Sequence, residues 1–471
     1  MTFNSLQFIF LYPLLFLFYH AIPARNNTLR NIYLLAVSYT LYACWKPVYV
    51  LVLLFVTVVT YASARFLLHV RHPKWLLFAS ILLTLLPLLT FKYLSFFNES
   101  ITNALSFIGW QIHLPGLNWA IPIGISFFTL QAISYTCDVY FKRIEPETNF
   151  LIYALFTSFF PSILSGPINK ASLMFPQFKC QRPSIDYDKF VEGMKMVLWG
   201  MLMKTVVADR VGLYVDTIMP NYQYYSGLTC FMASIFYTIQ IYADFAGYSL
   251  MAIGVGKTLG FELTENFRRP YFSYSVTDFW HRWHISLSTW LKDYIYIPLG
   301  GSRCSKLRNY FNILVTFLVS GIWHGANWTF IVWGGWHGLA QIIEKMLGQH
   351  KCTYGPFGKT IKIIITFLLI NFAWIFFRMP NIGDACHFIT RIFDFSQPFT
   401  LFYDDLQTIV LTFISIVILF SKDIRDEFFP THLPLMNNKN IIVRWGTYVF
   451  LVLTILLMGV FGADQFIYAN F

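Results

Sequence analysis

Two histidines lie inside an apolar stretch of the sequence, residues 318–339 (LVSGIWHGANWTFIVWGGWHGL). His324 and His337 each follow a tryptophan and precede a glycine. Because an ionisable side chain in hydrocarbon is costly, its presence there indicates a functional site. A neutral imidazole can take a proton from a hydroxyl group during group transfer. The alternative for either histidine is a hydrogen bond to a neighbouring carbonyl group at a helix interface.

The same stretch contains five glycines, which leave room for another backbone or a ligand to approach closely. They are Gly321, Gly325, Gly334, Gly335 and Gly338. His337 follows His324 by thirteen residues, so on an unbroken helix it lies on roughly the opposite face. A helix break at Gly334-Gly335 would remove that restriction, and a direct role for His337 therefore stays open.

A second pair of histidines lies in an aromatic and basic segment. Residues from Asp278 to about Tyr296 predict an amphipathic helix that lies at the membrane interface or enters the helix bundle, with Thr277 as its N-cap. His281 and His284 are three residues apart, so they are expected to share a face. A metal site needs a third ligand, and the zinc-protease motif His-Glu-x-x-His is absent. We therefore expect no metal.

The composition is that of a polytopic helical membrane protein. The chain has 471 residues, of which 56% are hydrophobic and 12% charged, whereas soluble proteins carry about 25% charged residues. Aromatic residues make up 20%, as in chains with many residues at the membrane interface. The basic residues behind the net charge of +11 lie in short loops between apolar runs. This pattern favours contact with membrane lipid and not with nucleic acid.

Apolar runs predict an all-α fold of roughly 11–13 transmembrane, re-entrant and interfacial helices, in a single domain over residues 1–471. The runs lie near residues 6–22, 31–45, 47–68, 75–97, 120–141, 150–164, 190–207, 228–255, 311–333, 336–347, 360–377, 405–421 and 443–461. Run 120–141 carries polar side chains that cannot all face lipid, so we expect an interior helix. Run 150–164 is short and stops at Ser-Gly-Pro, which indicates a re-entrant or discontinuous helix. Pro87 is expected to kink its helix, and residues 98–119 are expected to form a loop.

Two segments resemble the membrane-bound O-acyltransferase family, and within it the members that O-acetylate alginate. They are residues 278–303 (DFWHRWHISLSTWLKDYIYIPLGGSR) and 321–333 (GIWHGANWTFIVW). Shorter resemblances occur at residues 165–168 (SGPI), 174–177 (MFPQ), 242–254 (YADFAGYSLMAIG) and 466–471 (FIYANF). His281 departs from the pattern, because the family carries arginine at that place, and any role of that arginine is in doubt here.

The resemblance implies a reaction and a location. Such enzymes pass an acyl group, here acetyl from cytoplasmic acetyl-CoA, towards an exported polysaccharide, through a tunnel at the centre of the helices. The family's essential histidine corresponds to His324, as general base, and a second important histidine corresponds to His284. Loss of such a base lowers the rate about a hundred- to ten-thousandfold. The resemblance further implies the bacterial cytoplasmic (inner) membrane, no bound cofactor, and an extracytoplasmic partner protein that transfers the acetyl group onward.

Other residues are expected to support this chemistry. His337, Asn327 and Asp244 are candidates, and Asp244 either orients a histidine or bonds across helices. Four basic side chains are candidate contacts for the phosphates of CoA, with lipid headgroups as the alternative for each. They are Arg268, Arg269, Lys292 and Arg303.

Two other functions stay open from the sequence. The first is a D-alanyl transferase of the teichoic-acid type, whose donor is a thioester on a small carrier protein. The second is a transporter. Transporters tend to show paired repeats with broken helices in matching positions, and no such repeat is visible in this chain.

Overall fold

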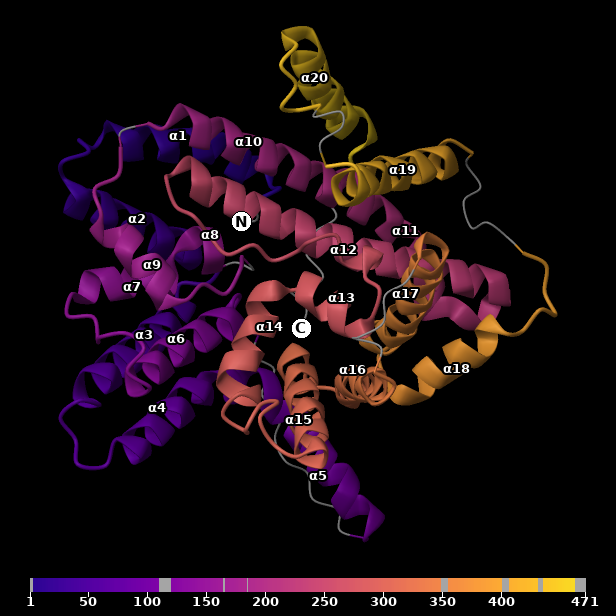
Figure 1. Cartoon of the computed structure of the whole chain (residues 1–471), viewed down its shortest axis with the longest axis horizontal. Coiled ribbons are helices and arrows are strands. Elements are labelled where there is room, and N and C mark those ends of the chain that lie inside the picture. The colour runs from indigo at the N-terminus through magenta and orange to yellow at the C-terminus, as the bar shows by residue number, and fades with distance from the viewer. Residues whose placement is uncertain are drawn as a thin grey trace. The chain divides into compact units, whose positions relative to one another are not determined.

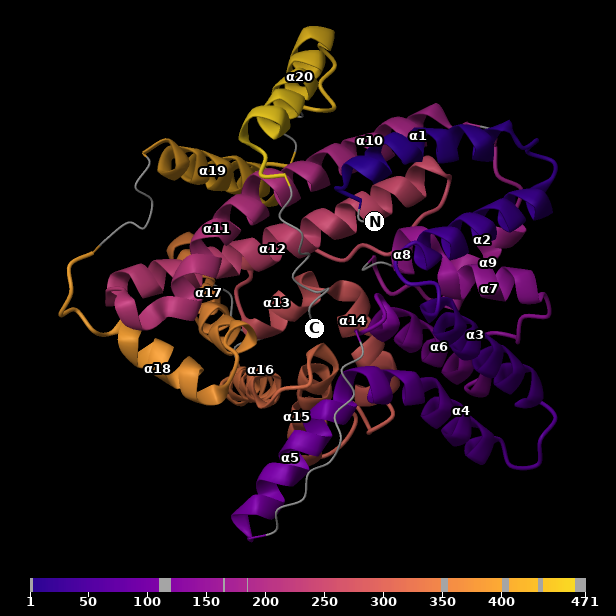
Figure 2. The same cartoon turned by 180° about the vertical axis from the view of Figure 1, so that it is seen from behind.

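The structure, a computed structural model, describes residues 3–109, 120–163, 166–183, 185–348, 355–399, 406–430 and 435–461. Every regular element in these residues is helical, so the predicted all-α class is confirmed. The chain forms two compact units, and each is described by itself. Unit 1 contains Met1–Gly193 and Ala252–Thr264, and unit 2 contains Met194–Met251 and Glu265–Phe471. Figures 1 and 2 show the helices from opposite sides.

Unit 1 is organised around one buried helix. Its helices are α1 (Leu6–Ala21), α2 (Asn27–Ala43), α3 (Tyr49–Phe66), α4 (Pro73–Leu88), η1 (Leu89–Tyr93), α5 (Leu94–Phe107), α6 (Ile125–Tyr140), α7 (Phe150–Ser158), α8 (Phe160–Ile163) and α9 (Ala171–Lys179). Both α3 and α4 pack against α6, and every residue of α6 from Ile125 to Val139 is buried. Gln131 Nε2 donates to the Phe156 carbonyl oxygen at 2.6 Å. The predicted interior helix is therefore confirmed.

The helix that follows α3 is longer than its apolar run. The elements α4, η1 and α5 form one continuous helix over Pro73–Phe107, so the loop expected over residues 98–119 is wrong for residues 98–107. Residues 110–119 lie outside the described part of the chain. The sequence of α5 (LSFFNESITNALSF) mixes apolar and polar residues at helical spacing, so its hydropathy falls while the helical pattern continues. The π-helical turn η1 begins two residues after Pro87, next to the place where a kink was expected.

The short run at residues 150–164 forms a discontinuous helix, as predicted. Helix α7 ends at Ser158, and Phe159 interrupts the helix with non-helical backbone angles before α8 begins. A Cβ atom on Gly166 would lie 2.6 Å from the carbonyl oxygen of Pro161. Only glycine therefore permits the chain to pass this closely over α8.

Unit 2 holds the remaining helices, and every candidate site residue lies in it. They are α10 (Tyr187–Leu202), which begins in unit 1, η2 (Met203–Ala208), α11 (Asp209–Ile218), η3 (Met219–Tyr224), α12 (Gly227–Thr258), which ends in unit 1, η4 (Pro270–Phe272), α13 (Val276–Arg282), α14 (Ile285–Leu291), η5 (Lys292–Tyr296), α15 (Lys306–His324), α16 (Trp328–Met346), α17 (Pro356–Arg378), α18 (Ile382–Ile392), α19 (Leu406–Phe428) and α20 (Ile441–Met458).

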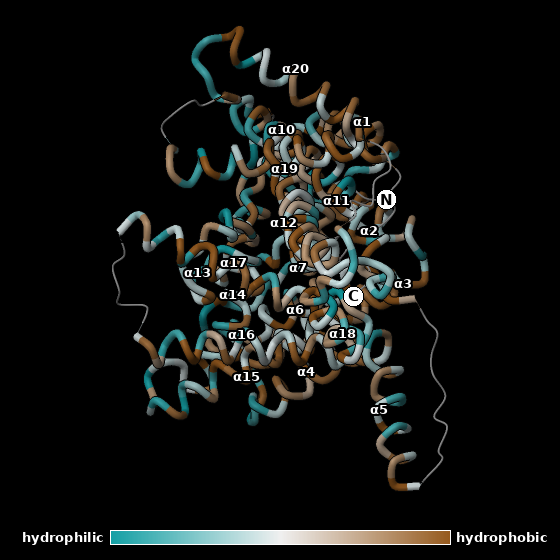
Figure 3. The backbone as a smooth tube through the Cα atoms, turned by 90° about the vertical axis from the view of Figure 1, so that its right-hand side faces the viewer, coloured by the Kyte–Doolittle hydropathy of each residue, from teal (hydrophilic) through white to brown (hydrophobic). Residues whose placement is uncertain are grey.

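Within the described residues, six helices are long and apolar enough to cross a membrane. They are α3, the continuous α4–α5 helix, α12, α17, α19 and α20. The most apolar stretch of α12 is 78% buried, whereas that of α20 is only 17% buried. Apolar residues prevail along α20 (Figure 3), so most of its apolar side chains are exposed. Exposed apolar side chains of this kind suit lipid. The chain is therefore a multi-pass membrane protein with α12 in its interior.

Helices α15 and α16 form a tight hairpin in unit 2. A Cβ atom on Gly321 would overlap the carbonyl oxygen of Phe330, and one on Gly334 would overlap the carbonyl oxygen of Phe317. The predicted close backbone approach at these glycines is confirmed. The considered break at Gly334-Gly335 is not found, because both lie inside α16. The helix breaks instead at Gly325, whose backbone is extended.

Candidate active site

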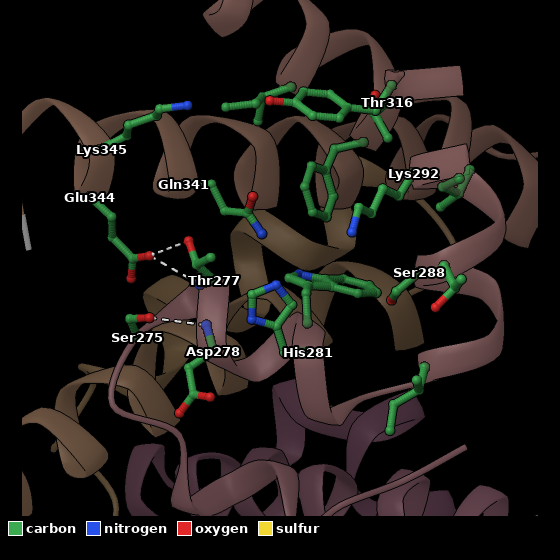
Figure 4. A pocket seen from close by; sticks show the side chains of 17 residues that line it. Ser275, Thr277, Asp278, His281, Ser288, Lys292, Thr316, Gln341, Glu344 and Lys345 are labelled. Atoms are coloured by element: carbon green, nitrogen blue, oxygen red, sulfur yellow. Dashed lines mark hydrogen bonds between the residues drawn. The ribbon is translucent and has the colours of Figure 1, made fainter. Parts of the chain in front are cut away.

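The segment that carries His284 begins with a capped short helix. Ser275 is the N-cap of α13, because its Oγ accepts from the Asp278 N–H at 3.0 Å. Glu344 of α16 accepts from the backbone N–H groups of Val276 and Thr277 at 2.5 and 3.0 Å, as Figure 4 shows for Thr277. The predicted N-cap Thr277 is therefore wrong by two residues. A carboxylate from another helix thus accepts from two of the N–H groups at the start of α13 that have no partner within the helix.

The predicted single helix over residues 278–296 is broken at His284. Trp283 is extended, and His284 takes the left-handed conformation with φ 43°. The backbone bonds instead to the segment before it: the Arg268 N–H donates to the Arg282 carbonyl, and the Ile285 N–H donates to the Asn266 carbonyl, both at 2.9 Å.

This break separates the two histidines that were expected to share a face. His281 is exposed, whereas His284 is fully buried. The helical spacing rule therefore does not apply to this pair, because α13 ends at Arg282.

His284 lies in an aromatic and amide pocket of unit 2. Its Nδ1 is 3.1 Å from Oδ1 of Asn266, and its ring centroid is 4.7 Å from that of Phe245 and 5.9 Å from that of Trp323. Burial lowers the pKa of His284 to about 3, because desolvation disfavours the charged imidazolium. The ring is therefore neutral at physiological pH.

Trp333 links the other two histidines. His324 is the last residue of α15 and His337 lies in the middle of α16. The ring centroid of Trp333 is 4.9 Å from that of His324 and 4.8 Å from that of His337. Both imidazoles are buried, with 2% and 0% exposure. The hairpin thus gathers around one indole two histidines that an unbroken helix would have placed on opposite faces.

Trp280 fixes the tautomer of His337. The indole Nε1–H of Trp280 donates to Nδ1 of His337 at 3.3 Å. Because an indole nitrogen is only a donor, Nδ1 must carry the lone pair, and the neutral ring carries its proton on Nε2. Among the described residues, that buried Nε2 has no hydrogen-bond partner. His337 therefore offers a proton donor.

A cavity of about 650 Å³ lies beside Trp280. Its lining includes Trp280, His281, Thr277, Lys292, Gln341 and Lys345. Figure 4 shows the labelled side chains around it, with the Lys292 amine, the His281 ring and Gln341 facing the same space. Trp280 therefore contacts both the cavity and the buried His337.

Two predicted supporting residues have structural partners. Asp244 and Asp209 each lie 2.7 Å from the ammonium group of Lys204, and all three side chains are buried. Asn327 is the N-cap of α16, since its Oδ1 accepts from the Thr329 N–H at 3.0 Å. These contacts favour bonding across helices as the role of Asp244.

Of the four basic residues predicted for CoA phosphates, Lys292 alone lines the cavity. Arg268 pairs with Glu265 at 2.5 Å, and Arg269 pairs with Glu427 at 2.7 Å. Arg303 is exposed and away from the cavity lining.

Sequence reasoning missed two polar residues of unit 2. Lys345 lines the cavity and donates to Oδ1 of Asn309. A basic side chain at the end of an apolar run is the sequence signal from which Lys345 could have been predicted. Asn266 bonds His284, and no spacing in the sequence relates these two residues. In the described residues, no group of three or more His, Cys, Asp or Glu side chains is placed to hold a metal.

Comparison with known proteins gives concordant results. Residues 142–382 match the model of the membrane-bound O-acyltransferase family. The probable alginate O-acetylase AlgI of Pseudomonas aeruginosa is 37% identical over 402 residues, covering 84% of this chain and 75% of that protein. The peptidoglycan O-acetyltransferase of Helicobacter pylori is 34% identical, covering 82% of this chain and 78% of that protein.

A third relative is named for a different activity. The teichoic acid D-alanyltransferase of Bacillus subtilis is 27% identical over 223 residues, covering 46% of this chain and 56% of that protein. The family match contains all of the candidate histidines described above.

Proposed function

Because the chain belongs to the membrane-bound O-acyltransferase family, we propose that it moves acetyl from acetyl-CoA for the O-acetylation of an exported polysaccharide. Two relatives named for O-acetylation of alginate and of peptidoglycan support an acceptor of this class. The proposed location is the bacterial cytoplasmic membrane. The proposed partner is an extracytoplasmic protein that receives the acetyl group and passes it on.

The observation that carries this proposal is the position of His324. It ends α15 as a buried imidazole, with the ring centroids of Trp323 and Trp333 at 4.8 and 4.9 Å. In the proposed reaction, His324 takes the proton of the acceptor hydroxyl as its oxygen forms a C–O bond to the acetyl carbon. The C–S bond of the thioester then breaks, and the proton passes to the CoA sulfur.

The proposed donor site is the cavity beside Trp280. Lys292 and Lys345 both line it, and ammonium groups suit the phosphates of CoA. Trp280 joins this cavity to His337. The donor thioester would therefore approach the histidines from the cavity side, while its charged part stays near the lysines.

A D-alanyl transferase remains the second candidate, because of the relative from Bacillus subtilis. The two candidates differ in donor. Membrane vesicles that contain the protein, its partner and the polysaccharide would be given either labelled acetyl-CoA or a carrier protein loaded with labelled D-alanine. We expect label in polysaccharide from acetyl-CoA alone. Label only from the D-alanyl carrier would replace the proposal, and label from neither donor would contradict both.

A further inference from the structure

The side chain and the backbone of Asn266 form several hydrogen bonds with residues at the break between α13 and α14, where His284 lies. The side chain of Asn266 is 1% exposed and that of His284 is 0% exposed. Oδ1 of Asn266 lies 3.1 Å from His284 Nδ1 and accepts from Ser286 Oγ at 2.9 Å. Its backbone carbonyl accepts from the Ile285 N–H at 2.9 Å. One asparagine therefore holds both the ring and the backbone that follows it.

The orientation of the Asn266 amide is determined by its neighbours. The backbone N–H of Ser286 donates to Oδ1 at 3.3 Å, and a backbone N–H is a donor only. A flipped amide would place an NH2 group against that N–H. In the observed orientation, Nδ2 donates to Oγ of Ser249 at 3.1 Å. The atom that faces His284 is therefore an acceptor.

An acceptor at Oδ1 determines which nitrogen of His284 carries the proton. Nδ1 must donate, so the neutral ring has its lone pair on Nε2. We propose that Asn266 is a positioning residue for acyl transfer, which holds His284 in the tautomer with its proton on Nδ1 and its lone pair on Nε2. This inference rests on the proposed function only for the use of that lone pair in catalysis.

The arrangement gives the site two histidines of opposite tautomer. His337 is held by Trp280 with its proton on Nε2, whereas His284 is held by Asn266 with its proton on Nδ1. With His324 as the general base, these two neutral rings add one hydrogen-bond donor and one hydrogen-bond acceptor to the site. In serine proteases, a buried acceptor likewise holds a catalytic histidine in its working tautomer.

The tautomer can be measured without any assay of activity. The protein in detergent micelles would carry 15N-labelled histidine, and a long-range 1H–15N spectrum distinguishes protonated from bare ring nitrogens. Comparison with His284→Gln identifies the His284 signals. We expect a protonated Nδ1 and a bare Nε2. A bare Nδ1 with a protonated Nε2 in the wild type overturns the proposal, whether or not the protein proves to be an acetyltransferase.

Two substitutions test the link to catalysis. We expect Asn266→Ala to lower kcat about ten- to a hundredfold, as losses of an orienting partner commonly do, with KM for acetyl-CoA nearly unchanged. Asn266→Asp keeps an acceptor oxygen and adds a charge that favours the imidazolium. We expect it to keep the Nδ1-protonated form and recover kcat at alkaline pH. The acid limb of its pH profile should move to higher pH.

Asn371→Ala is the matched control. Asn371 is also buried at 4% exposure, and its amide bonds Thr238 and Ser234. We expect its kcat and the His284 spectrum to match the wild type. Equal losses of kcat in Asn371→Ala and Asn266→Ala, or a wild-type pH profile in Asn266→Asp, would reduce Asn266 to a structural residue and overturn the proposal.

Discussion

Trp280 and His337 are joined by a hydrogen bond in which the indole N–H donates to the imidazole Nδ1 at 3.3 Å. The same tryptophan lines the cavity that also contains Lys292. A ligand in the cavity that displaces Trp280 would therefore alter the hydrogen bond that Trp280 donates to the buried His337.

Trp280→Phe keeps an aromatic ring but removes the donor to His337. A neutral hydrogen bond is worth about 1 kcal/mol, so we expect kcat to fall about five- to tenfold. Trp290→Phe is the control, because Trp290 is also buried but does not line the cavity. Acetyl-transfer rates of the two purified variants give the comparison. An unchanged kcat in Trp280→Phe would remove His337 from the account.

Lys292→Ala tests the proposed donor cavity. Loss of one charge-assisted contact to a phosphate costs about 1.5–3 kcal/mol, so KM for acetyl-CoA should rise at least tenfold while kcat changes little. The effect should shrink at high salt, because ions screen an open cavity. Lys306→Ala, an exposed lysine at the start of α15, should leave KM unchanged. Equal KM values in both variants would place the donor elsewhere.

Two neighbouring glycines of α16 predict opposite stability effects. A Cβ atom on Gly334 would overlap the Phe317 carbonyl oxygen, whereas one on Gly335 would meet only Leu318 Cδ2 at 3.9 Å. Gly334→Ala should lower the free energy of unfolding by about 1–3 kcal/mol through overpacking. Gly335→Ala should be neutral or stabilising, because alanine favours a helix over glycine. Thermal unfolding in detergent measures both, and equal effects would argue against the tight hairpin.

Asp244→Ala separates the two roles considered for this carboxylate. Lys204 would keep one partner, Asp209, at 2.7 Å, but the buried cluster of three charged side chains would lose one of its two carboxylates. Removing a partner from such a group costs about 3–5 kcal/mol. We expect a large loss of folded protein, while the kcat of the folded fraction stays close to the wild-type value. A folded variant with a strongly reduced kcat would instead assign Asp244 to the histidines.

The sequence predicted much of this architecture, because hydrophobic runs and glycine spacing are local signals. The interior position of α6 followed from polar residues in an apolar run, and the close α15–α16 approach followed from its glycines. The break at His284 was missed, because it depends on backbone bonds to Asn266 and Arg268, far along the chain. Helical spacing therefore placed His281 beside His284, although one is exposed and the other buried.

The long-range partners of the site could not be predicted for the same reason. The contacts of Trp280 with His337, of Glu344 with Thr277 and of Asn266 with His284 each join separate elements. No local pattern of charge or hydropathy encodes such pairs. Family resemblance led to the prediction of His324 and His284 as site residues without these contacts, whereas the surroundings of both histidines could be described only from the fold.

The most direct test of His324 as the general base is acetyl transfer from labelled acetyl-CoA, measured in membrane vesicles that carry the wild type or His324→Ala at matched expression. His387→Ala is the control, because His387 is exposed on α18. We predict that label reaches the acceptor with the wild type and the control, and that His324→Ala lowers the rate at least a hundredfold. Equal rates in His324→Ala and the wild type would contradict the assignment of His324 as the general base.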